Sequence, residues 1–138
     1  MLTGLAIRDL VLIETLDLTF GPGLVALTGE TGAGKSILLD GFGLALGARA
    51  ESGLVRQGAA QAAVTASFAP PDGHPAFALL EELGIEAEDQ QLVLKRVIGA
   101  DGRGRAFVND APVAVGTLRR LAGLLVEAQG QHDQVGLA

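Results

Sequence analysis

Residues 29–36 have the residue types and the spacing of a phosphate-binding loop. They read GETGAGKS, a full match to the pattern G-x-x-x-x-G-K-[ST]. The glycines permit backbone angles that a Cβ forbids, so the loop can fold around an anion with its N–H groups pointing inward. Lys35 supplies a charge for the β- and γ-phosphates, and the Ser36 hydroxyl is placed to bind Mg²⁺. The residues predicted to bind the nucleotide are Gly29, Glu30, Thr31, Gly32, Ala33, Gly34, Lys35, Ser36 and Ile37.

Apolar segments on both sides of this loop predict the elements that would position it. Residues 24–28 form a continuous apolar run, as expected for a strand buried on both faces. Residues 35–46 are expected to form a helix that ends near Gly47. The loop would then lie at the positive end of the helix dipole, which favours a bound phosphate. Gly41 and Gly43 lower helix stability, so we expect close packing against a neighbour there.

The rest of the chain predicts further strands and two more helices. The expected strands are residues 5–10, 11–20, 62–68, 91–98 and 105–109, the last two forming a hairpin around 100–102. The expected helices are residues 75–83, stopped by Gly84, and 118–125. Together these elements predict an α/β fold, in which a P-loop core with a mixed sheet lies beside an antiparallel β-lobe formed by residues 62–109.

Composition limits the class of protein. The length of 138 residues suits one compact domain or a large piece of one. The chain has no Cys, which excludes disulfides and thiolate metal sites and fits a reducing cytosolic compartment. The N-terminus lacks the features of a signal peptide, and no apolar run is long enough for an expected membrane span. A net charge of −6 argues against a broad nucleic-acid footprint.

Two clusters of charge have a simple interpretation as solvated faces. The acidic cluster is Glu81, Glu82, Glu86, Glu88 and Asp89. The basic cluster is Lys95, Arg96, Arg103 and Arg105, followed by Arg119 and Arg120. An alternative for Arg103 and Arg105, which flank a predicted turn, is contact with DNA.

Two parts of a complete ATPase site are missing from the sequence. A P-loop ATPase needs an acidic residue at the end of an apolar strand, and an ABC-type ATPase also needs a Leu-Ser-Gly-Gly signature. The nearest acidic candidates, Glu81 and Glu82 or the single Glu127, lie in segments of helical or weakly apolar character. We therefore expect the first half of an ATPase, inactive by itself. A GTPase would need Asn-Lys-x-Asp and a small-molecule kinase an Arg-rich lid, and neither is found.

The whole chain closely resembles the N-terminal half-head of the RecN family of SMC-like DNA repair ATPases. The segment TGETGAGKSILLD, residues 28–40, carries the resemblance most specifically, since SMC proteins usually have Asn-Gly-Ser in the middle of this loop. Two departures are Gln129, where RecN proteins often have His, and Asp110, where Gly is frequent after Asn109. Asn-Asp can still form a tight turn. The other matching stretches are residues 5–10, 20–23, 46–50, 55–59, 101–109 and 130–132.

The resemblance implies an ABC-type head acting in DNA double-strand break repair and recombination. In such a head, two copies sandwich two ATP molecules, and each P-loop meets the partner's signature motif. A long coiled coil separates the two halves of the head in sequence. The implied partners are the C-terminal half of the same head, a second head, double-stranded DNA with ends and the recombination machinery. The implied location is the cytoplasm, at the bacterial nucleoid, without a membrane.

The resemblance also implies catalytic residues outside the loop. Gln129 or Gln131 would be the Q-loop residue that touches Mg²⁺ and the attacking water, although either could be an ordinary loop amide. Arg56 resembles the SMC arginine that reaches the γ-phosphate, with a plain surface arginine as the alternative. The implied catalytic residues are thus Lys35, Gln129, Gln131 and Arg56, and the implied metal ligands are Ser36 and Gln129. His132 and Asp40 are interpreted as structural.

Overall fold

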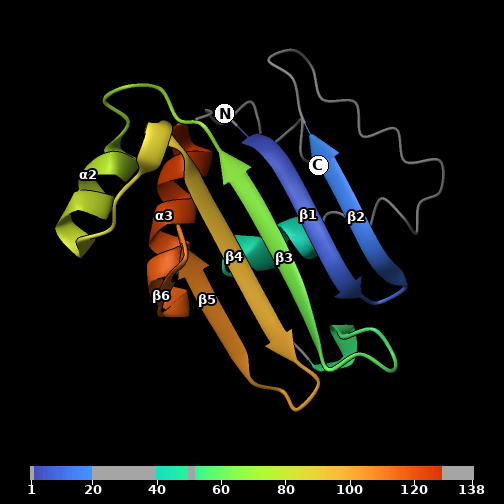
Figure 1. Cartoon of the computed structure of the whole chain (residues 1–138). Coiled ribbons are helices and arrows are strands. Elements are labelled where there is room, and N and C mark those ends of the chain that lie inside the picture. Colours follow the sequence, from blue (N-terminus) through green and yellow to red (C-terminus); the bar gives the residue numbers. More distant parts are fainter. Residues whose placement is uncertain (1, 20–39, 50–51, 129–138) are drawn as a thin grey trace.

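The structure is a computed structural model that describes residues 2–19, 40–49 and 52–128. In this part of the chain, six strands form one antiparallel sheet in the order β2-β1-β3-β4-β5-β6 (Figure 1). The strands are β1 (Leu2–Leu10), β2 (Ile13–Thr19), β3 (Gln61–Phe68), β4 (Leu92–Gly99), β5 (Gly104–Val108) and β6 (Ala111–Val113). The described helices are α2 (Pro75–Leu83), α3 (Val115–Ala128), residues 40–45 and the 3₁₀ turns η1 (Ser52–Leu54) and η2 (Glu88–Gln90).

The N-terminal hairpin and the expected β-lobe belong to the same sheet. Ile7 of β1 lies opposite Leu16 of β2 on one side and opposite Val64 of β3 on the other. The lobe formed by residues 62–109 is therefore antiparallel, as predicted, but it continues directly from the hairpin. The strand predicted at residues 24–28, which would make the sheet mixed, lies outside the described residues.

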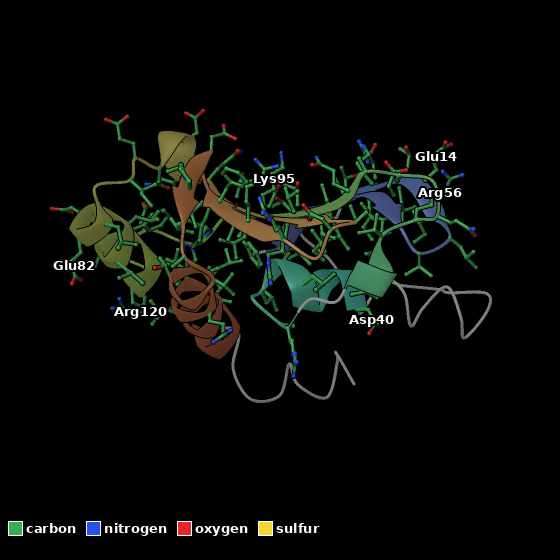
Figure 2. The ribbon with its side chains drawn as sticks, turned by 90° about the horizontal axis from the view of Figure 1, so that it is seen from below. Glu14, Asp40, Arg56, Glu82, Lys95 and Arg120 are labelled. Atoms are coloured by element: carbon green, nitrogen blue, oxygen red, sulfur yellow. The ribbon has the colours of Figure 1, made fainter. Side chains whose placement is uncertain are left out.

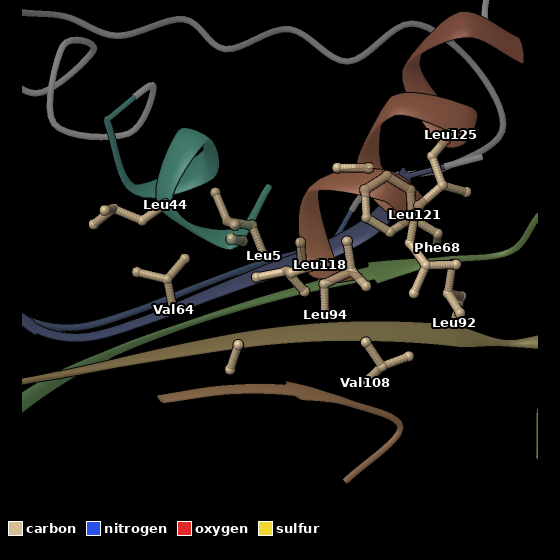
Figure 3. Packing of buried hydrophobic residues seen from close by; sticks show 14 of the residues in the cluster. Leu5, Leu44, Val64, Phe68, Leu92, Leu94, Val108, Leu118, Leu121 and Leu125 are labelled. Atoms are coloured by element: carbon tan, nitrogen blue, oxygen red, sulfur yellow. The ribbon is translucent and has the colours of Figure 1, made fainter. Parts of the chain in front are cut away.

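One face of the sheet is buried against helices, because alternate residues of each strand are apolar. Leu5, Val64, Leu94 and Val108 point to this face and belong to one buried cluster with Leu44 of residues 40–45 (Figure 3). Helix α3 adds three buried side chains to the same core, those of Leu118, Leu121 and Leu125. Both helical segments thus lie on one side of the sheet, and the core fixes where they sit.

The opposite face carries polar side chains. Lys95, Glu14 and Arg56 lie on the side of the sheet away from α3 and residues 40–45 (Figure 2). The Lys95 ammonium is 5.8 Å from the centre of the Phe107 ring, within range of a cation–π contact. Among the described residues, no helix is long and apolar enough to cross a membrane.

Both tight turns of the β4–β6 region follow local chemistry. At the β4–β5 turn, Gly102 has φ +90° and the Asp101 carboxylate accepts a hydrogen bond from the backbone N–H of Arg103 at 3.0 Å. At the β5–β6 turn, Asn109 and Asp110 have φ 48° and 70°, as a two-residue type I′ turn requires. Asp110 can therefore take the turn position at which RecN proteins often have Gly, because Asn and Asp adopt the left-handed region more readily than other side chains.

The helix boundaries agree with their sequence signals to different degrees. Helix α2 has the predicted bounds and ends at Gly84, which has φ +74°. Helix α3 is longer than the predicted 118–125. The helical segment at residues 40–45 ends before Gly47, which has φ +100°, as predicted, while residues 35–39 lie outside the described part.

Candidate nucleotide-binding site

The phosphate loop, residues 29–37, and both candidate Q-loop residues, Gln129 and Gln131, lie outside the described residues, as does His132. The structure does describe the helical segment that follows the loop and helix α3, which ends at Ala128 directly before Gln129. These two elements are in contact: the Arg119 side chain donates from Nε to the Gly47 carbonyl at 3.0 Å. The fold therefore holds together the two elements that adjoin the predicted site segments.

Arg96 of β4 contacts the same end of the helical segment. Its Nη1 atom donates to the carbonyls of Leu44 at 3.2 Å and Ala48 at 2.8 Å. Carbonyls at the end of a helix lack partners within the helix and carry partial negative charge, which a cation stabilises. The side chain is only 5% exposed, and burial lowers the pKa of its guanidinium, with a smaller effect from the charge of Arg119.

The interpretation of Arg96 as part of a solvated basic face is wrong. Residues of a strand alternate between faces, and Arg96 shares the core face with Leu94 and Ile98, whereas Lys95 points to the opposite face. This period-two pattern was present in the sequence and would have marked Arg96 as buried. Arg103, by contrast, is 91% exposed at the β4–β5 turn, 3.9 Å from the Asp101 carboxylate, and Arg105 is exposed.

Arg56 lies beside the turn that joins β1 and β2. Its backbone N–H donates to the Asp9 carbonyl at 2.8 Å. Its guanidinium is 40% exposed, 3.9 Å from the Asp9 carboxylate and 4.0 Å from the Glu14 carboxylate (Figure 2). Exposed ion pairs at such distances contribute little, about 0–1 kcal/mol. A γ-phosphate contact for Arg56 stays a prediction, and so does the structural interpretation of Asp40, which is exposed at the start of the described helical segment.

The acidic candidates for the catalytic carboxylate lie in helices. Glu81 and Glu82 belong to α2, and Glu127 belongs to α3. None of them follows a strand, as the catalytic carboxylate of a P-loop ATPase does. Within the described ranges, no group of three or more His, Cys, Asp or Glu residues is arranged to hold a metal ion.

A family comparison identifies the class of the chain. Residues 5–92, which include the phosphate loop, match the family described as "AAA domain". This chain belongs to the AAA domain family. The match covers more than half of the chain and leaves out all but the first residue of β4, together with β5, β6 and α3.

Relatives of this AAA domain are DNA repair proteins named RecN. The chain is 40% identical over 134 residues to RecN of Haemophilus influenzae, covering 96% of this chain and 24% of that protein. It is 43% identical over 133 residues to RecN of Xylella fastidiosa, covering 96% of this chain and 24% of that protein. It is 41% identical over 133 residues to RecN of Bacillus subtilis, covering 96% of this chain and 23% of that protein. The resemblance to RecN is confirmed, and the chain spans about a quarter of the length of these relatives.

Solved structures with the same fold are ATPase heads. A head of the SMC ATPases, described in terms of "ATP-driven dimerization and DNA stimulated activation", has a TM-score of 0.70 and 19% identity, covering 91% of this chain and 79% of that chain. The SMC head domain from Thermotoga maritima has a TM-score of 0.64 and 17% identity, with coverages of 86% and 41%. The recombination mediator protein RecF has a TM-score of 0.60 and 16% identity, with coverages of 86% and 29%. The predicted fold, the N-terminal lobe of an SMC-type P-loop ATPase head, is confirmed.

Proposed function

We propose that this chain is the ATP-binding N-terminal half of an SMC-like ATPase head that acts in DNA double-strand break repair and recombination. The observation that carries the proposal is the identity of 40–43% to RecN proteins over nearly the whole chain, including a complete phosphate-loop motif. The fold shared with SMC heads supports it.

In this proposal each site residue has a separate role. Residues 29–37 enclose the triphosphate, Lys35 balances the charge of the β- and γ-phosphates, and Ser36 binds Mg²⁺. Gln129 or Gln131 orients the attacking water and touches the metal. Arg56 meets the γ-phosphate, which would require its guanidinium to leave Asp9 and Glu14; the long distances of those pairs make that exchange inexpensive.

The described residues fit a bound triphosphate at the start of the helix. Two arginines meet the carbonyls at the C-terminal end of residues 40–45, so the negative end of the helix dipole is neutralised in the core. The phosphate loop precedes this segment in sequence, so the proposal puts the triphosphate at the positive end of the helix. ATP–Mg²⁺ bound there would supply the phosphoryl group for hydrolysis, with the signature motif and the acidic residue coming from the rest of two heads.

The proposed partners follow from the same relationship. They are the C-terminal half of the head, a second head engaged through ATP, double-stranded DNA with ends and the recombination machinery, in the cytoplasm at the nucleoid. SMC heads described with ATP-driven dimerization and DNA stimulated activation support the second head and the DNA. Arg103 and Arg105, both exposed, are the candidate DNA contacts in the described part of the chain.

The test is Lys35→Ala in a complete head, with ATP–Mg²⁺ affinity measured by calorimetry and turnover by phosphate release. We expect affinity to fall at least about tenfold, because a charge on the β- and γ-phosphates is lost. Lys95→Ala is the matched control, since Lys95 lies on the open face of the sheet and should leave ATP binding unchanged. Unchanged affinity and turnover in Lys35→Ala would contradict the proposed function.

A further inference from the structure

Positive charge is left unpaired on the open face of the sheet, the face away from α3 and residues 40–45. On the β1–β2 side of this face, the Asp17 carboxylate lies 2.9 Å from Nη1 of Arg8, so these two charges compensate each other. Lys95 of β4 and Arg105 of β5 have no carboxylate within 4.0 Å among the described residues. The β4–β5 side of the open face is therefore locally basic, although the chain as a whole has a net charge of −6.

An aromatic ring lies next to both of these cations. Lys95 points to the open face (Figure 2), and Phe107 is directly opposite Lys95 in the β4–β5 register, with its ring centre 5.8 Å from the ammonium. The neighbours of Phe107 on β5, Ala106 and Val108, are buried in the core, so its ring belongs to the open face, where it is partly exposed. Arg105 lies two residues before Phe107 on the same face, about 7 Å away along the strand.

Small side chains flank Lys95 on its other side. Thr65 of β3 is directly opposite Lys95, and Ala6 of β1 is directly opposite Thr65. Ala63 occupies the next position of β3 on the open face. Side chains of this size rise little above the backbone. An extended ligand that crosses the face from β5 towards β1 would therefore meet no bulky side chain at these positions.

These groups match the two chemical parts of an unpaired nucleic-acid strand. Cations such as Lys95 and Arg105 attract phosphates, and an aromatic ring stacks with a base. In a duplex, each base is stacked between neighbouring base pairs, so the Phe107 ring could stack on a base only in an unpaired strand. An acidic protein segment would pair with the two cations without requiring the ring beside them. The arrangement therefore favours a single strand over a duplex or an acidic peptide.

We propose that Lys95, Arg105 and Phe107 bind single-stranded DNA on the open face, with phosphates beside the two cations and one base stacked on the ring. Arg103, which is 91% exposed at the β4–β5 turn, extends the same basic path. This inference rests on the proposed function, which gives DNA with ends as a partner, and it adds that the open face holds the unpaired strand of such an end. Binding there does not require ATP, since none of these residues belongs to the phosphate loop.

The experiment measures the Kd of a labelled oligothymidylate by fluorescence anisotropy, with a complete head, without nucleotide and at several salt concentrations. We expect Phe107→Leu to raise Kd about tenfold, because the leucine cannot stack on a base, whereas Phe107→Tyr keeps a ring and should bind like the wild type. Lys95→Gln should raise Kd and reduce the slope of log Kd against log salt by about 1, because one phosphate contact is lost. Arg120→Gln is the control, since Arg120 is an exposed cation of α3, on the other side of the sheet.

Wild-type Kd in either Phe107→Leu or Lys95→Gln would overturn the proposal, and so would an equal loss in Phe107→Tyr or Arg120→Gln. If Phe107→Leu does not fold, the salt slope of Lys95→Gln decides: a reduced slope supports the proposal and an unchanged slope overturns it.

Two further probes test the kind of ligand. A blunt duplex should bind Phe107→Leu and the wild type equally, and an equal loss for duplex and single strand would contradict stacking on the ring. If the wild-type head binds polyglutamate but not oligothymidylate, the face docks an acidic protein and the proposal is wrong. Unchanged ATP binding in Lys35→Ala contradicts the proposed function itself, whereas the oligonucleotide assay contains no ATP and tests only the open face.

Discussion

At the scale of single residues, the hydrogen bond by which His74 caps helix α2 depends on the protonation state of its ring. It is the N-cap of α2: its Nδ1 atom accepts a hydrogen bond from the backbone N–H of Ala76 at 2.9 Å. Only a ring with Nδ1 unprotonated can accept this bond. The side chain is 6% exposed, and burial lowers the pKa of His74 from its ordinary value of 6.5. The folded state therefore favours the neutral imidazole.

This pKa shift predicts that the chain loses stability in mild acid. Below about pH 6.5 the unfolded state binds more protons than the folded state, so the free energy of unfolding should fall with falling pH and level off above pH 6.5. We expect the free energy of unfolding to be lower at pH 5.5 than at pH 7.5, because protonation of the ring removes the acceptor that caps the helix. His74→Asn, a cap that does not titrate, should flatten this dependence in urea unfolding curves measured at both pH values.

The second histidine, His132, is present in both the wild type and His74→Asn, so its own titration contributes equally to the two pH profiles. An identical pH dependence in the wild type and His74→Asn would mean that another group controls acid stability.

At the scale of elements, Gly41 sets how closely residues 40–45 approach the sheet. A Cβ at this position would lie 3.0 Å from Cδ1 of Ile7 and 3.3 Å from Cδ2 of Leu10, both of β1. At Gly43 the nearest atom would be the Cβ of Ala48 at 3.8 Å, an ordinary contact. The prediction of close packing at glycine is thus confirmed at Gly41 and does not hold at Gly43.

Gly41→Val should therefore destabilise the fold by about 1–3 kcal/mol, the usual result of overpacking a core. Gly43→Val, whose Cβ would make only an ordinary contact with Ala48, should change stability by less than about 0.5 kcal/mol. Both values come from urea unfolding. Equal effects of the two substitutions would show that helix propensity, which is the same at both sites, outweighs the contact with β1.

At the scale of the whole molecule, the described part of the chain is an ATPase lobe in which none of the residues considered for the catalytic carboxylate follows a strand. The acidic residues considered for that role lie in α2 and α3. We therefore expect residues 1–138 alone to show no appreciable steady-state hydrolysis of ATP, because water activation and the signature contact are missing. Phosphate release by the purified segment measures this. Turnover that is abolished by Lys35→Ala would instead place a catalytic carboxylate within this chain.

The local elements could be predicted because their signals are local. Pro75 at the start of α2 and Gly84 at its end gave the correct bounds, since both act through their own backbone angles. The β4–β5 hairpin was likewise predicted from Gly102 and alternating apolar residues. The pairing of β1 with β3 was not predicted. These strands are separated by more than forty residues in sequence, and nothing in either strand specifies its partner.

The sequence by itself determined the phosphate-loop motif and the family, because a glycine-rich loop with lysine and serine has its chemistry in consecutive residues. Only the tertiary structure decided that Arg96 and Arg119 meet carbonyls at the end of the helical segment 40–45, which follows the loop in sequence. These contacts join residues about fifty to seventy positions apart. Such pairs depend on how the sheet brings β4 and α3 to residues 40–45, and residue types alone do not specify that packing.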